Sequence, residues 1–226
     1  MTALRRTAIT AGVLYLVTHV TSIAAVALYA PVLSDPAYVT GRGADAQIYL
    51  GGLLEIVLAL AIVGTAVTLF PVVRPYGESR ALGYVALRTL EAATIIVGVV
   101  ALLAVVTLRQ QLAASSVLDQ TSFVTAARAL VAVHDWTFLL GPNFVLGTNT
   151  VLLASLMYQS RLVPRFIGAL GMIGGTLIFA SAVAELFGVY TQISVWGALT
   201  AIPVFAWELS LALWLIFRGF SPAATE

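Results

Sequence analysis

Six long apolar stretches dominate this chain of 226 residues, and each is long enough to cross a lipid bilayer as a helix. A backbone inside lipid must satisfy its own hydrogen bonds, which restricts spanning structures to helices and closed barrels. Continuous apolar runs, rather than alternating ones, favour helices. The sequence therefore predicts an all-α fold, a polytopic membrane helical bundle with six transmembrane helices. The predicted spans are residues 7–30, 47–70, 81–108, 138–158, 164–187 and 195–217.

Composition agrees with a lipid environment and excludes several kinds of chemistry. The chain is 61% hydrophobic and 9% charged, with a mean hydropathy of +1.02. There is no cysteine, which excludes disulfides and thiolate sites, and no lysine, which excludes lysine Schiff bases and P-loops. A net charge of +1 provides no basic surface for nucleic acid. The lipid bilayer is the one partner that composition predicts, and one domain over residues 1–226 is expected.

The segment before the fourth span allows two topologies. Residues 121–137 are helical in pattern but carry Arg128, His134 and Asp135, so they form either a seventh span or an extension of the fourth helix. Six spans with a cytoplasmic N-terminus concentrate arginine on the cytoplasmic side, whereas seven spans largely remove that asymmetry, so the positive-inside rule favours six. We predict six spans, an uncleaved first helix rather than a signal peptide, and a kinked, extended fourth helix. The arginines on the cytoplasmic side would be Arg5, Arg6, Arg74, Arg80, Arg161, Arg165 and Arg218; Arg42, Arg109 and Arg128 would lie outside.

Charged side chains inside the spans are the leading candidates for a functional site. Each costs on the order of 2.5–3.5 kcal/mol to place at the centre of a bilayer. Arg88 and Glu91 are three residues apart, hence on one helix face, and can neutralise each other. Glu55 and Glu208 have no such local partner. Surplus buried carboxylate must be protonated, paired across helices, or neutralised by a bound cation.

Polar residues around the fourth span form a second group of candidates. His134 and Asp135 precede it, Pro142 interrupts it, and Asn143 and Asn149 follow the proline and place amide groups inside the span. Proline removes a helical hydrogen bond and can expose backbone groups to a cavity. Packing and interfacial roles explain these residues equally well. The acids and histidines show no metal-ligand spacing, so no metal site is predicted.

We expect structural roles for His19 and Glu185. His19 lies in the first span near threonines, where it can hydrogen-bond to a neighbouring helix. Glu185 lies near the outer end of the fifth span, within reach of the membrane interface.

Three segments resemble a known family. They are residues 87–91 (Leu-Arg-Thr-Leu-Glu), 141–143 (Gly-Pro-Asn) and 158–165 (Tyr-Gln-Ser-Arg-Leu-Val-Pro-Arg). In these the chain resembles the bacterial integral-membrane family catalogued as domain of unknown function 4386. The resemblance implies a helical bundle in the bacterial inner membrane and implies no activity or cofactor.

Three functional hypotheses follow from the buried charges. The first is a membrane protein that binds or transports a small solute, cation or proton at a carboxylate/arginine site. The second is a non-catalytic assembly or sensor subunit whose charges are satisfied between helices. The third is a membrane-embedded enzyme acting on a lipid, with His134, Asp135 and Glu208 converging in one cavity. The sequence predicts neither the oligomeric state nor a cofactor.

Overall fold

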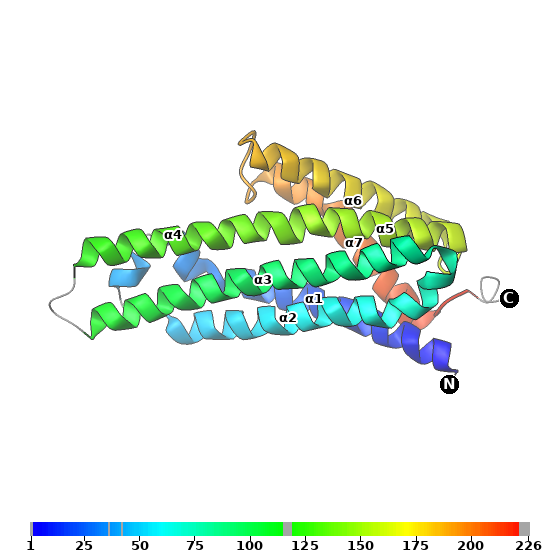
Figure 1. Ribbon diagram of the computed structural model, residues 1–226, viewed down its shortest axis with the longest axis horizontal. Helices are drawn as coiled ribbons and strands as arrows, with labels where there is room; N and C mark the ends of the chain where they lie inside the picture. Colours follow the sequence, from blue (N-terminus) through cyan, green and yellow to red (C-terminus); the bar gives the residue numbers. More distant parts are fainter. Residues whose placement is uncertain (1, 36, 42, 115–118, 222–226) are drawn as a thin grey trace.

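The described structure is entirely helical. The computed structural model describes residues 2–35, 37–41, 43–114 and 119–221, and these contain no strand. The long helices lie roughly along one axis, and both termini lie at the same end, called here the terminal end (Figure 1). In chain order the elements are α1 (Ala3–Ser34), η1 (Tyr38–Thr40), α2 (Asp45–Val73), η2 (Arg74–Tyr76), α3 (Glu78–Ala113), α4 (Gln120–Leu139), the π-helical η3 (Leu140–Val145), α5 (Leu146–Ser160), α6 (Arg165–Leu186) and α7 (Val195–Phe217).

Six helical segments of the described chain are long and apolar enough to cross a membrane. The fourth is the continuous run Gln120–Ser160, made of α4, η3 and α5. The prediction of six spans is therefore confirmed, and so is the extension of the fourth helix. That helix begins 18 residues before the predicted span boundary at residue 138.

The fourth helix continues past its apolar part because its polar half still packs on neighbours. Asp119 caps its first turn, accepting hydrogen bonds from the backbone amides of Thr121 and Ser122. Ala127 is buried in a small core with residues of α1, α2 and α3. The predicted interruption appears as π-helical turns around Pro142. A proline that cannot donate its hydrogen bond is commonly accommodated by such turns.

The six spans close into a ring. Along the chain α1 packs on α2, α2 on α3, α3 on both α4 and α5, α5 on α6 and α6 on α7; α7 then returns to α1. Small residues allow the closest approach between α6 and α7, where Gly174 faces the backbone of α7. Ring closure brings α1 and α7, at opposite ends of the sequence, against the same interior as α3.

At the end of the bundle away from the termini, polar contacts join α2, α3 and η1. Arg109 of α3 forms an ion pair with Asp45 at the start of α2, with its Nε 2.6 Å from Oδ1. Tyr38 of η1 donates a hydrogen bond to the same carboxylate at 2.9 Å. Burial and this hydrogen bond raise the pKa of Tyr38, so its hydroxyl remains a donor at neutral pH. Arg42, predicted to lie at this end, is outside the described residues.

Candidate functional site

Arg88 and Glu91 form an ion pair inside the ring, on the face of α3 that their spacing predicts. Arg88 Nη1 lies 3.1 Å from Glu91 Oε2, and both side chains are buried. Asn149 of α5 donates a hydrogen bond of 2.7 Å to the same carboxylate oxygen. Thr65 of α2 accepts from Arg88 Nη2 at 3.3 Å. The pair is thus satisfied by partners on three helices.

An aromatic ring also contacts the guanidinium of Arg88. The Arg88 Cζ lies 5.4 Å from the centroid of the Tyr15 ring, a cation–π contact. The Tyr15 hydroxyl is hydrogen-bonded to that of Tyr84 at 3.0 Å. These contacts fix the direction in which Arg88 points, which is toward the interior face of α7.

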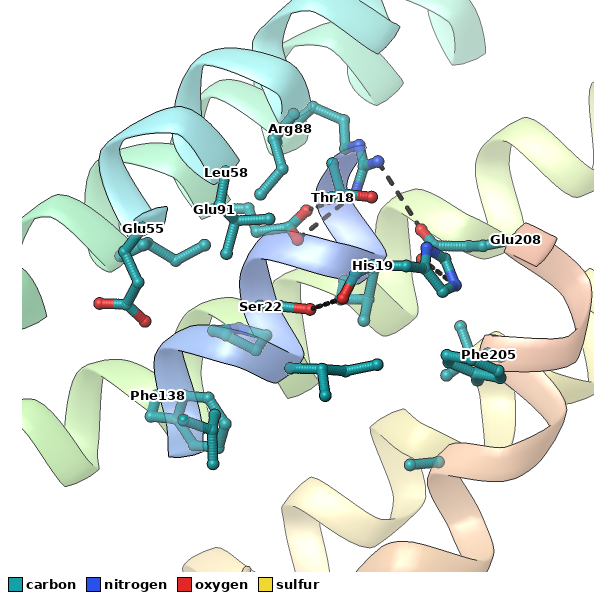
Figure 2. Close-up of a pocket in the computed structure, with 18 residues that line it drawn as sticks. Thr18, His19, Ser22, Glu55, Leu58, Arg88, Glu91, Phe138, Phe205 and Glu208 are labelled. Carbon is teal, nitrogen blue, oxygen red and sulfur yellow. Dashed lines mark hydrogen bonds and ion pairs between the residues drawn. The ribbon is translucent and has the colours of Figure 1, made fainter. Parts of the chain in front are cut away.

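Glu208 of α7 stands opposite this pair with longer contacts. Its Oε1 lies 3.6 Å from Arg88 Nη2, and its Oε2 lies 3.9 Å from His19 Nε2 of α1. Both distances exceed the roughly 2.7–3.2 Å of an ordinary hydrogen bond. Figure 2 shows the Glu208 carboxylate between the guanidinium and the imidazole. Within the described residues, no hydrogen bond reaches this carboxylate, so it retains free acceptor capacity.

The contacts of His19 determine which of its nitrogens is protonated. Nδ1 lies 2.9 Å from the carbonyl oxygen of Tyr15. A carbonyl oxygen only accepts, so Nδ1 carries a hydrogen, and Nε2 of a neutral ring would hold a lone pair. That lone pair would face the Glu208 carboxylate. A proton added to His19 Nε2 would turn this 3.9 Å contact into an ion pair.

These side chains line a cavity, called here the inner cavity, of about 400 Å³. Three carboxylates, Glu55, Glu91 and Glu208, face it together with a single arginine, Arg88 (Figure 2). The rest of its wall is mainly apolar. The wall residues are Thr18, Ser22, Ile23, Val26, Leu58, Ile62, Ile95, Phe138, Pro142, Leu146, Ala201, Val204 and Phe205, together with His19.

Glu55 of α2 lies at the boundary between this cavity and a second one. It accepts a hydrogen bond of 3.0 Å from the Tyr29 hydroxyl and is 6% exposed. The second cavity, called here the outer cavity, has about 500 Å³ and lies between α1, α4 and the loop that joins α6 to α7. His134, Asp135 and Glu185 line it. Val26, Glu55 and Phe138 are common to both walls.

The structure therefore separates the predicted site residues into two groups. Arg88, Glu91, Asn149 and Glu208 come together at the inner cavity. His134 and Asp135 line the outer cavity, with His134 Nδ1 3.2 Å from Asp135 Oδ1. Asn143 donates to Glu185 at 3.0 Å, and Glu185 also accepts from Ser181 at 2.8 Å.

Three residues of the inner site did not stand out in the sequence. For His19 the sequence predicts a structural hydrogen bond to a neighbouring helix, and Thr65 and Tyr15 are ordinary members of apolar helices. Their partners lie on other helices, at sequence separations of 23 residues or more. The sequence does show that glutamates outnumber arginines inside the spans. That excess predicts further partners for the carboxylates, but it does not identify them.

Among the residues that the structure describes, no group of three or more histidine, aspartate and glutamate side chains is arranged to hold a metal ion. The chemistry that the inner site offers is ion pairing, hydrogen bonding and proton exchange. These require no cofactor.

Comparison with known proteins places the chain in a family. No curated protein and no solved structure matches it. The family model described as a domain of unknown function (DUF4386) matches residues 10–219, which include all six spans apart from the first turns of α1. The chain therefore belongs to the DUF4386 family.

Proposed function

We propose that this multi-pass membrane protein binds a small solute at the inner cavity and exchanges it against a proton held between His19 and Glu208. The single observation that carries the proposal is the arrangement of this pair. Nδ1 of His19 donates to a carbonyl, which leaves Nε2 facing the Glu208 carboxylate at 3.9 Å, where an added proton would be stabilised. Removing or moving that proton changes the charge of the cavity wall by one unit.

The charge balance supports the same function. Arg88 neutralises Glu91 through close contacts, which leaves Glu55 and Glu208 facing the cavity. Ionised side chains at bilayer depth are retained mainly where they act. A site that alternates between a bound proton and a bound solute would keep these carboxylates neutralised in both states.

Orientation and membrane belong to the proposal as well. At the terminal end lie Arg5, Arg74, Arg80 and Arg165, whereas Arg109 and Arg128 lie toward the opposite end. The positive-inside rule then places the terminal end in the cytoplasm and the outer cavity on the other side. We propose a single membrane domain in the bacterial inner membrane, with the solute moving between the two cavities past Glu55.

Infrared difference spectroscopy tests the proton site directly. Protein in lipid nanodiscs would be titrated between about pH 5 and 8, the range in which an ordinary histidine changes charge. We expect a carboxylic-acid or imidazole band that changes in the wild type and is lost in Glu208→Gln. Glu78→Gln is the matched control, because Glu78 is an exposed glutamate paired with Arg74. Identical spectra in wild type and Glu208→Gln would contradict the proposal.

Native mass spectrometry tests the solute. Protein extracted in a mild detergent should carry a small molecule that is retained in Glu78→Gln and lost in Glu208→Gln. The proposal fails if the wild-type protein carries no small molecule and its infrared bands do not respond to pH. The buried charges would then serve only helix packing.

A further inference from the structure

Part of the wall of the inner cavity, on α1 and α7, is exposed on the outside of the bundle. Three apolar residues of its wall are well exposed: Ile23 is 61%, Val26 45% and Phe205 43% accessible. They lie in the middle of their helices, so these surfaces face lipid rather than water. The ring of Phe205 lies 4.6 Å from that of His19, measured between centroids (Figure 2). A molecule dissolved in the membrane could therefore reach the site sideways.

The wall indicates what kind of molecule the cavity accepts. A volume of about 400 Å³ lies within the range of small-molecule sites. Most of the wall is aliphatic or aromatic, which favours an apolar body. Arg88, Glu91 and Glu208 meet at one side of the cavity, and Glu55 lies apart from them (Figure 2).

The sign of the charge at that polar side favours a cation. Arg88 is already engaged by Glu91 at 3.1 Å and by Thr65 at 3.3 Å. Among the described residues, the nearest partner of Glu208 lies at 3.6 Å, and Glu55 has one hydrogen bond, from Tyr29. An anion would meet two incompletely satisfied carboxylates and an arginine that is already paired. A cation would gain a contact with Glu208 without breaking the Arg88–Glu91 pair.

We infer that the ligand of the inner cavity is a membrane-soluble monocation, an apolar body carrying one ammonium group, with Glu208 as its counter-ion. This rests on the proposed function and names its substrate class. The cation reaches the site from the lipid between α1 and α7. Its charge replaces the proton between His19 and Glu208, so about one proton leaves for each cation bound. His19 then returns to the neutral ring with its Nδ1 hydrogen on the Tyr15 carbonyl.

The groups that face this proton set its dependence on pH. From α3 they are Arg88 and Glu91, from α1 Tyr15, and from α2 Glu55 across the cavity. Cation binding should therefore strengthen as pH rises and the pair gives up its proton.

Calorimetry on nanodisc-embedded protein tests the inference with benzyltriethylammonium as the probe. Benzenesulfonate serves as the anion of similar body, and empty nanodiscs correct for partition into lipid. We expect saturable binding of the ammonium and none of the sulfonate. In Glu208→Gln the affinity should fall by about tenfold or more, the effect of losing one contact to a charged group, while Glu78→Gln binds as the wild type does. Repeating the titration in buffers of different ionisation enthalpy measures the released proton.

A separate variant tests whether the ligand enters from the lipid. Ile23→Trp places a large side chain on the exposed part of the wall without altering charge, and it should slow association of the ammonium without loss of the infrared titration. Binding of the sulfonate instead, or a phospholipid or second copy of the chain occupying the site in native mass spectra, would overturn the inference. If infrared bands still depend on Glu208 in that case, the proposed proton site stands and only the ligand class is wrong. If the wild type also shows no pH-dependent band that depends on Glu208, both proposals fail.

Discussion

Removal of Arg88 should destabilise this protein far more than removal of an equivalent surface arginine. Arg88 is 2% exposed and contacts Glu91, Glu208 and Thr65. Arg88→Met keeps the length of the side chain but leaves two carboxylates without their cation. Breaking a buried ion pair by deleting one partner costs about 3–5 kcal/mol. For a chain of this size that lowers the unfolding temperature by about 6–20 °C.

Thermal unfolding in detergent, followed by tryptophan fluorescence, measures this effect. Arg74→Met is the control, because Arg74 pairs with Glu78 at 2.7 Å but is 56% exposed in its side chain. An exposed pair contributes about 0–1 kcal/mol. The double variant Arg88→Met with Glu91→Gln should recover about 1–3 kcal/mol relative to additivity, since the glutamine amide can still bond to Asn149. Equal losses in the two single arginine variants, or strict additivity, would refute the role assigned to this pair.

Three further changes have defined outcomes. Tyr29→Phe removes the donor to Glu55 and should cost about 1.5–3 kcal/mol in the same unfolding assay, less when Glu55 is also changed to Gln. Gly174→Ala should destabilise by about 1–3 kcal/mol because its Cβ would lie 2.7 Å from the backbone of α7, whereas Gly52→Ala, with 3.5 Å of clearance, should be tolerated. The pKa of Asp119 is held below its ordinary value by a hydrogen bond from the Ser122 hydroxyl and by bonds from the backbone amides of Thr121 and Ser122. Its capping contribution is therefore present above about pH 3.9 and is lost as pH falls through the lower folded value. Asp119→Ala should reproduce that loss at neutral pH as faster amide exchange in the first turn of α4.

The spans could be predicted from sequence because lipid leaves the backbone few options. A run of apolar residues inside a bilayer must be helical, whatever packs beside it. The start of α4 did not follow from this rule, since residues 120–137 include Arg128, His134 and Asp135 and have a lower hydropathy. That helix is stabilised by packing of Ala127 and its neighbours on α3, which is a tertiary contact.

The site was predictable to the extent that its contacts are local. Arg88 and Glu91 share a helix face, and their spacing alone indicates a pair. Glu208 and His19 join them only because α7 returns to α1 and closes the ring. A single sequence does not determine which helices become neighbours. The excess of buried carboxylates over arginine could therefore be predicted, but the arrangement of these side chains could not.

The stability and ligand binding of Glu208 variants distinguish a structural role for the buried charges from a functional one. The Arg88–Glu91 pair, with Thr65 and Asn149, already forms a satisfied unit, and Glu208 adds contacts of 3.6 and 3.9 Å. A carboxylate with such long contacts loses hydration without regaining it in hydrogen bonds, so Glu208→Leu should leave stability nearly unchanged, because Arg88 keeps its close pair with Glu91. The same variant should lose ligand binding and the infrared titration. A protein whose charges served packing alone would behave in the opposite way, losing stability at Glu208 as it does at Arg88. The two unfolding temperatures, measured side by side, therefore decide whether this carboxylate is retained for the fold or for the ligand.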